Sequence, residues 1–242
     1  MLVRTLLQIN GNHIYKNHAD KNFLLKKFAF FASCLLAFLL SVDAHSASKT
    51  ILVLGDSLSA EYGLARGTGW VPLLEKKLRA DTRSYTVANA SISGDTTSGG
   101  LSRLPSMLSK DKPSIVVIEL GGNDALRGLS LAATETNLRS MIDMVKKTGA
   151  RVVLLGMQIP PNYGPDYTRR FSDIYVKLAK EKKVALVPFF LEGLQTRPDL
   201  FQPDRIHPVA AAQPLLLNNV WKVLEPLLRA TAPMASVAAK PA

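Results

Sequence analysis

The chain has 242 residues, of which 47% are hydrophobic and 20% are charged, a composition that supports one hydrophobic core of ordinary size rather than two. Its net charge is +11, but the basic residues are scattered, without a binding motif or interleaved aromatic side chains, so we expect no nucleic-acid partner. Cys34 is the only cysteine, which excludes an internal disulfide and a zinc site built on several thiolates.

Residues 1–47 have the layout of a secretory signal peptide. Lysines at 26–27 precede an apolar run at 28–40, and small residues follow within 44–47. The run has 13 residues, fewer than the roughly twenty that cross a bilayer core, so we expect cleavage near 44–47 and no stable membrane span in the mature protein. This layout predicts a periplasmic or secreted protein.

From Thr50 onward, strand-like and helix-like segments alternate. Short runs rich in Val, Ile and Leu are typical of strands that are covered on both faces, and five of them occur, at 51–54, 85–88, 115–120, 152–155 and 185–187. Apolar residues at helical spacing predict helices around 138–145 and 171–178. A further helix is predicted from about Val209 to Arg229, in which Pro214 either produces a kink or marks the true start.

This alternation predicts an α/β fold. Because neighbouring parallel strands need crossover connections of helical length, we expect a three-layer α/β/α sandwich with a five-stranded parallel sheet. One domain is expected over residues 48–229. The Ala- and Pro-rich tail at 230–242 is expected to be disordered.

A G-D-S-L-S segment at 55–59 follows the first predicted strand. Its serine, Ser57, becomes a nucleophile only if a base removes the hydroxyl proton. A serine at this point also suits the N-cap of a following helix. The segment alone leaves both interpretations open.

The base is found by elimination among four histidines. His13 and His18 lie in the leader and His45 lies at its cleavage region, which leaves His207 for the folded part. Asp204 precedes His207 by three residues, and an aspartate there can accept the imidazole N–H, fix the tautomer and stabilise the imidazolium. A helix N-cap is the alternative role for Asp204.

Two further polar segments follow predicted strands. Gly94, within 91–95, can expose its backbone N–H because it has no Cβ, and Asn123, within 121–124, can offer a side-chain amide. Such donors stabilise the oxyanion that develops in acyl transfer. Each segment alone is also an ordinary turn. However, ligands bind at the carboxyl ends of parallel strands, so these donors and Ser57 are expected at one edge of the sheet.

The four blocks at 55–59, 89–96, 121–124 and 204–208 occur in the order found in SGNH hydrolases. The sequence resembles this family over about residues 51–228 and, more closely, its bacterial multifunctional thioesterase I/lysophospholipase L1/arylesterase group. The resemblance implies a flavodoxin-like SGNH hydrolase fold.

The resemblance also implies roles for single residues. Ser57 would be the nucleophile, His207 the general base and then acid, and Asp204 the residue that orients it. The N–H groups of Ser57 and Gly94 and the amide of Asn123 would form the oxyanion hole. It further implies cleavage of acyl esters such as aryl esters and lysophospholipids, and of acyl thioesters, without a metal or an organic cofactor. We expect a monomer whose partners are these small-molecule substrates.

Two other functions remain open. A deacetylase acting on acetylated saccharides would share all four blocks, and a catalytically silent lipid-binding module would keep the fold. An α/β-hydrolase is disfavoured because it needs a G-x-S-x-G turn, and nucleotide binding is disfavoured because the glycine-rich phosphate motifs are missing from the sequence.

Two places depart from the family pattern. Glu61 stands where relatives often have a small residue. Its carboxylate either repels phosphate-bearing thioesters, or Glu61 is an exposed helix residue without a role in the site. The segment at 157–161 is short at a place where similar enzymes build part of the acyl-chain pocket. A preference for chain length is therefore not predicted.

Overall fold

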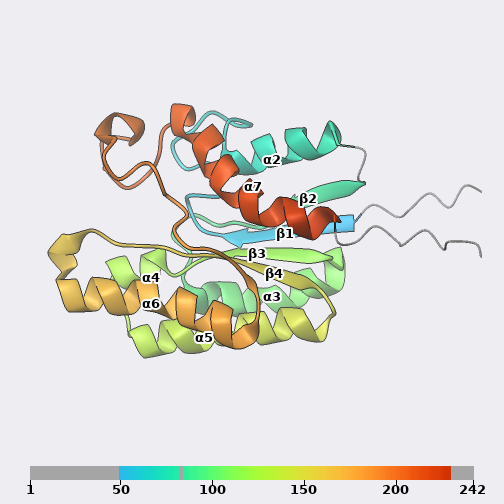
Figure 1. The fold of residues 1–242 in the computed structure, drawn as a ribbon, viewed down its shortest axis with the longest axis horizontal. Coiled ribbons are helices and arrows are strands. Elements are labelled where there is room, and N and C mark those ends of the chain that lie inside the picture. Colours follow the sequence, from blue (N-terminus) through green and yellow to red (C-terminus); the bar gives the residue numbers. More distant parts are fainter. Residues whose placement is uncertain (1–48, 82–83, 230–242) are drawn as a thin grey trace, which may run out of the picture. The chain divides into compact units, whose positions relative to one another are not determined.

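Five parallel strands form the centre of the fold (Figure 1). The computed structural model describes residues 49–81 and 84–229, so the predicted signal peptide and the C-terminal tail lie outside the described residues. The strands are β1 (Lys49–Gly55), β2 (Tyr85–Asn89), β3 (Ile115–Glu119), β4 (Arg151–Leu155) and β5 (Ala185–Val187). Every residue of β3 is buried, as expected for a strand that is covered on both faces.

Helices cover both faces of the sheet. They are α2 (Trp70–Arg79), α3 (Thr97–Asp111), the short α4 (Gly122–Leu126), α5 (Leu131–Lys147), α6 (Pro165–Lys182) and α7 (Gln213–Arg229). Figure 1 shows α2 and α7 packed together on one face, with α3, α5 and α6 on the other. The predicted three-layer α/β/α sandwich is therefore confirmed.

The strand order β2-β1-β3-β4-β5 places a topological switch point between β1 and β3. From β1 the chain moves outward to β2, and α3 then returns it to the other side of β1. In parallel register, Gly55 at the end of β1 lies beside Glu119 at the end of β3. The loops after β1 and β3 therefore diverge around a crevice, which is where such sheets bind ligands.

The predicted strands are confirmed, with boundaries shifted by at most two residues. Helices α5 and α6 contain the two predicted apolar stripes, and α7 begins at Gln213, so Pro214 marks a helix start and does not kink it. Helix α3 is not predicted by the sequence patterns because two glycines and Pro105 lower its helix propensity. No helix within 49–81 or 84–229 is long and apolar enough to span a membrane.

Tyr175 of α6 fixes the turn between β3 and α4. The side chain is fully buried, and its hydroxyl donates a hydrogen bond of 2.9 Å to the carbonyl of Leu120. The next residue, Gly121, has a φ of +113°, and a Cβ there would lie 2.3 Å from the Tyr175 hydroxyl. Only glycine suits this position, and the turn leads directly into the helix that carries Asn123.

Removing the Tyr175 hydroxyl tests this anchor. We expect Tyr175→Phe to lower the free energy of unfolding by about 1–3 kcal/mol, because the buried carbonyl of Leu120 loses its donor. Tyr163→Phe is the matched control: that ring is 39% exposed and its hydroxyl donates to the Leu126 carbonyl at 3.2 Å. Water replaces this bond, so we expect a change below about 0.5 kcal/mol in urea denaturation. Equal effects of the two substitutions would contradict the anchoring role.

Candidate active site

Ser57, His207 and Asp204 form a continuous chain of hydrogen bonds. Ser57 lies in the turn after β1, and its Oγ is 2.8 Å from Nε2 of His207, a residue 150 positions later in the chain. The other ring nitrogen, Nδ1, is 2.7 Å from Oδ2 of Asp204. The fold thus brings together all three predicted residues in an arrangement that can deprotonate the serine hydroxyl.

Asp204 organises the loop that carries His207. Its Oδ1 accepts hydrogen bonds from the backbone N–H groups of Ile206, at 2.9 Å, and His207, at 3.0 Å. Burial raises the pKa of Asp204, but these two backbone hydrogen bonds and the imidazole outweigh it and lower the pKa to about 2. Asp204 therefore caps a turn in its ionised form, and the alternative of a helix N-cap is not found.

Tyr62 covers the imidazole from the side of the β1 loop. Its ring centroid lies 4.4 Å from that of His207, with an angle of 40° between the ring planes. The side chain of Gln202 donates to the Tyr62 carbonyl at 2.9 Å, while the Gln202 backbone N–H donates to the His207 carbonyl at 2.7 Å. The loops of the serine and the histidine are thereby joined.

Glu61, beside Tyr62, is not a helix residue. It lies in a turn with a φ of +60°, and its carboxylate accepts the N–H groups of Gly67 and Gly69, with shortest distances of 2.9 and 2.7 Å. The interpretation as an exposed helix residue is therefore wrong. The carboxylate holds the loop that leads into α2.

The backbone donors predicted for the oxyanion hole are available. Gly94 has a φ of +79°, which glycine adopts without strain. Among the described residues, no acceptor takes the N–H of Ser57 or of Gly94. Both groups are therefore free to donate to a bound substrate.

The side-chain amide of Asn123 hydrogen-bonds to two acceptors. Its Nδ2 lies 3.0 Å from Oδ2 of Asp56 and 2.9 Å from the backbone carbonyl of Asp95. An amide NH₂ has two hydrogens, so both have an acceptor in the free protein. A substrate oxygen that binds to this amide must therefore replace one of these two acceptors.

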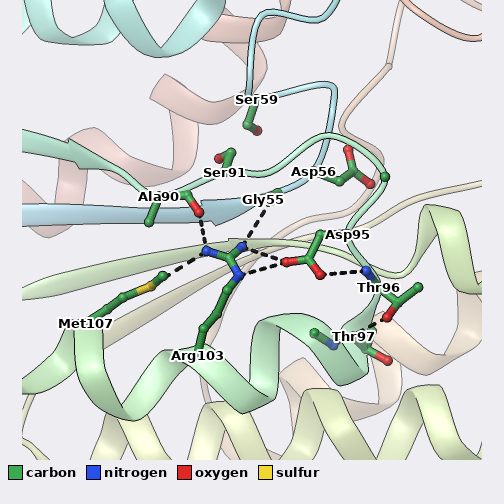
Figure 2. A network of polar contacts seen from close by, with 12 residues as sticks. Gly55, Asp56, Ser59, Ala90, Ser91, Asp95, Thr96, Thr97, Arg103 and Met107 are labelled. Carbon is green, nitrogen blue, oxygen red and sulfur yellow. Dashed lines mark hydrogen bonds and ion pairs between the residues drawn. The ribbon is translucent and has the colours of Figure 1, made fainter.

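Arg103 of α3 fixes the loop that carries Gly94. Figure 2 shows its guanidinium between Asp95 and the backbone carbonyls of Ala90 and Gly55. The ion pair with Asp95 is 2.7 Å long, and both side chains are largely shielded from solvent. One cation thus joins the ends of β1 and β2 to the Gly94 loop.

Two buried carboxyl groups behind Ser57 are not among the predicted site residues. Asp56 is 3% exposed and Glu119 is 1% exposed. Burial raises the pKa of Asp56 to about 6, and burial together with the Asp56 charge raises the pKa of Glu119 well above its usual range. The sequence does contain a signal, because Glu119 ends a strand that is otherwise apolar, and buried charges are rare.

A largely apolar cavity of about 520 Å³ opens beside Ser57 and His207. The segment at 157–161 lines it, which places this short segment in the wall of the pocket. The apolar side chains of the wall come from several loops and include Leu126, Met157, Ile159, Phe189, Leu191 and Phe201.

Known proteins are similar to most of this chain. A model of the GDSL-like lipase/acylhydrolase family matches residues 53–214. The chain is 53% identical over 197 residues to esterase TesA of Pseudomonas aeruginosa, a match that covers 81% of this chain and 97% of TesA. It is 41% identical over 220 residues to thioesterase 1/protease 1/lysophospholipase L1 of Escherichia coli K12, covering 91% of this chain and 98% of that protein.

A solved structure of TesA has the same fold. It superimposes with a TM-score of 0.72 at 55% identity and covers 74% of this chain and 99% of its own. The family match includes Ser57, Asn123 and His207 and extends from within β1 to the start of α7. The chain therefore belongs to the GDSL-like lipase/acylhydrolase family.

Proposed function

We propose that this protein is a serine hydrolase that cleaves carboxylic acyl esters, including aryl esters and lysophospholipids, and acyl thioesters through an acyl-enzyme on Ser57. The observation that carries the proposal is the hydrogen-bonded chain from Ser57 through His207 to Asp204 at the mouth of an apolar cavity. A nucleophile, its base and an orienting carboxylate are the parts that acyl transfer needs.

In the proposed reaction, the Ser57 Oγ attacks the acyl carbonyl while Nε2 of His207 takes its proton. Asp204 stabilises the imidazolium that results. The oxyanion accepts hydrogen bonds from the N–H groups of Ser57 and Gly94 and from the amide of Asn123. His207 then protonates the leaving alcohol or thiol, and water releases the acyl group by the same steps.

The cavity favours lipid-like acyl groups over acetylated saccharides. An aliphatic or aromatic acyl group gains free energy when its apolar surface leaves water against a wall of this kind. An acetyl group is too small to use the volume, and saccharide hydroxyls need polar partners once they are buried. The name of the Escherichia coli relative, thioesterase 1/protease 1/lysophospholipase L1, supports thioesters and lysophospholipids as substrates.

We also propose that the protein works as a monomer, in the periplasm or outside the cell. Support for export comes from the lysines at 26–27, the apolar run at 28–40 and the small residues within 44–47.

Cleavage of the leader is directly testable. Expression of the full chain in a Gram-negative host is expected to yield an exported protein whose first residue lies between 45 and 48. N-terminal sequencing of the exported protein measures the position. An unprocessed chain retained in the inner membrane would contradict the proposal.

A substrate panel with a nucleophile variant tests the reaction. We expect the protein to hydrolyse medium- and long-chain acyl esters, aryl esters and lysophospholipids faster than acetylated saccharides. Ser57→Ala should lower kcat by at least about 10³-fold, because no other group replaces the attacking oxygen. Thermal unfolding of the variant controls for the fold. Undiminished hydrolysis by Ser57→Ala would refute the mechanism, and a preference for acetylated saccharides would favour the deacetylase.

The pH dependence follows from the state of the triad. Acidification is expected to lower kcat/KM, because the base cannot accept the Ser57 proton once it is protonated and because Asp56, whose pKa burial raises to about 6, also takes up a proton in this range. Asp204, with its pKa lowered to about 2, stays ionised, so its contribution to stability is present above about pH 4 and is lost only as the pH falls toward 2. Measurement of kcat/KM from about pH 9 to 5, with circular dichroism at each point, should show lost activity in a folded protein. A flat profile would contradict His207 as the base.

A further inference from the structure

Asp56 and Glu119 form a contact between two carboxyl groups at the switch point of the sheet. Asp56 follows the last residue of β1, and Glu119 is the last residue of β3. Both side chains are more than nine-tenths buried and hydrogen-bond to each other. Two carboxylates in direct contact and shielded from water cannot both be ionised at low cost, so one of them carries a proton.

Burial and the neighbouring charge show which one is the acid. The Oε2 atom of Glu119 accepts from the backbone N–H of Asp56, at 3.2 Å, and from the hydroxyl of Ser59, at 2.8 Å. These two hydrogen bonds lower the pKa of Glu119, but its deep burial and the charge of Asp56 outweigh them and raise the pKa well above its usual range. Asp56 therefore ionises first, so Glu119 is the carboxylic acid of the pair and Asp56 the carboxylate.

The Asp56 carboxylate has one partner on each side of the nucleophile. Its Oδ1 accepts the backbone N–H of Leu58, the residue after Ser57, at 3.0 Å. Its Oδ2 accepts one hydrogen of the Asn123 amide, also at 3.0 Å. A single buried anion thus connects the turn of the nucleophile to the side-chain donor of the oxyanion hole.

The two acceptors of the Asn123 amide are not equivalent. Hydrogen bonds to an ionised carboxylate are about twice as strong as hydrogen bonds to a neutral carbonyl. The hydrogen bond from Asn123 to Asp56 is therefore stronger than the one to the Asp95 carbonyl. When a negatively charged substrate oxygen arrives, it competes best against the neutral Asp95 carbonyl. The hydrogen that is not bound to Asp56 is therefore the one that the oxyanion receives.

We propose that Asp56 is a positioning residue of the oxyanion hole: its carboxylate, held by the buried carboxylic acid of Glu119, retains one hydrogen of the Asn123 amide and so presents the other to the substrate. The proposal rests on the proposed function, because Asn123 needs this orientation only if Ser57 generates an oxyanion. A positive charge on His207 lowers the pKa of Asp56 and so favours the Asp56 carboxylate.

The test begins with Asp56→Asn, assayed on a soluble aryl ester at about pH 8. The Leu58 N–H and the Asn123 amide donate to different oxygens of Asp56, and asparagine replaces one of these oxygens with an NH₂ group that cannot accept. We expect kcat to fall about 10- to 100-fold, while KM changes less than about threefold, because loss of one oxyanion-hole donor costs roughly 10²- to 10³-fold in kcat. An unchanged kcat in a folded variant would overturn the proposal.

A double-mutant cycle separates positioning from a general structural effect. If Asp56 acts through Asn123, Asp56→Asn should change kcat by less than about threefold in an Asn123→Ala background. A purely structural role would lower kcat by the same factor in both backgrounds, and this result would overturn the proposal. Should Asp56→Asn fail to fold, Asp56→Ser takes its place in the cycle, because its hydroxyl can accept the Leu58 N–H while being too short for the Asn123 amide.

Glu119→Gln is the matched control for the acid. Its oxygen can accept from the Asp56 N–H and the Ser59 hydroxyl, and its amide can donate to the Asp56 carboxylate as the acid does. We expect kcat within about threefold of the unmodified protein and an unchanged thermal midpoint. A loss as large as that of Asp56→Asn would overturn the assignment of the proton to Glu119.

The outcomes distinguish this inference from the function on which it rests. Hydrolysis that persists in Ser57→Ala would refute the proposed function. An inactive Ser57→Ala together with an additive cycle between Asp56 and Asn123 would leave the function intact and refute only the positioning role.

Discussion

The pairing of β1 with β3 is the constraint on which the site depends. Their parallel register sets Gly55 beside Glu119, and a Cβ at Gly55 would lie only 2.7 Å from Oε2 of that side chain. Because Gly55 has no side chain, the Glu119 carboxyl reaches the turn of the nucleophile and accepts the Asp56 N–H. The buried carboxyl group of Glu119 thus helps to fix the position of Ser57, in addition to packing.

Buried carboxyl groups recur around this edge of the sheet, and each has its own donors. Asp124, directly after Asn123, accepts from the backbone N–H and hydroxyl of Thr97 and from the hydroxyl of Thr134. It thereby joins α4 to the starts of α3 and α5. Such networks are stable only when every polar group is satisfied, and they then hold a unique geometry. The segment that carries Asn123 is therefore held by buried polar contacts as well as by packing.

Much of this architecture follows from local sequence. The apolar runs define the strands, since a strand covered on both faces must be apolar, and the alternation with helices implies parallel pairing. Ser57 and His207 are identified by residue chemistry and by elimination among the histidines, and the order of the four blocks points to the family. Helix α3 is not predicted from the sequence because its glycines and Pro105 have low helix propensity.

The sequence by itself therefore determined the sheet and the reaction type and pointed to Ser57, Asp204 and His207 as the candidate triad, because these depend on local pattern and on chemical type. Only the tertiary structure decided the contact between Asp56 and Glu119, the tilted contact of the Tyr62 ring with His207 and the cavity wall. It also decided that Glu61 holds a loop. Each of these depends on side chains that strand register and loop packing bring together, so no spacing along the chain encodes them.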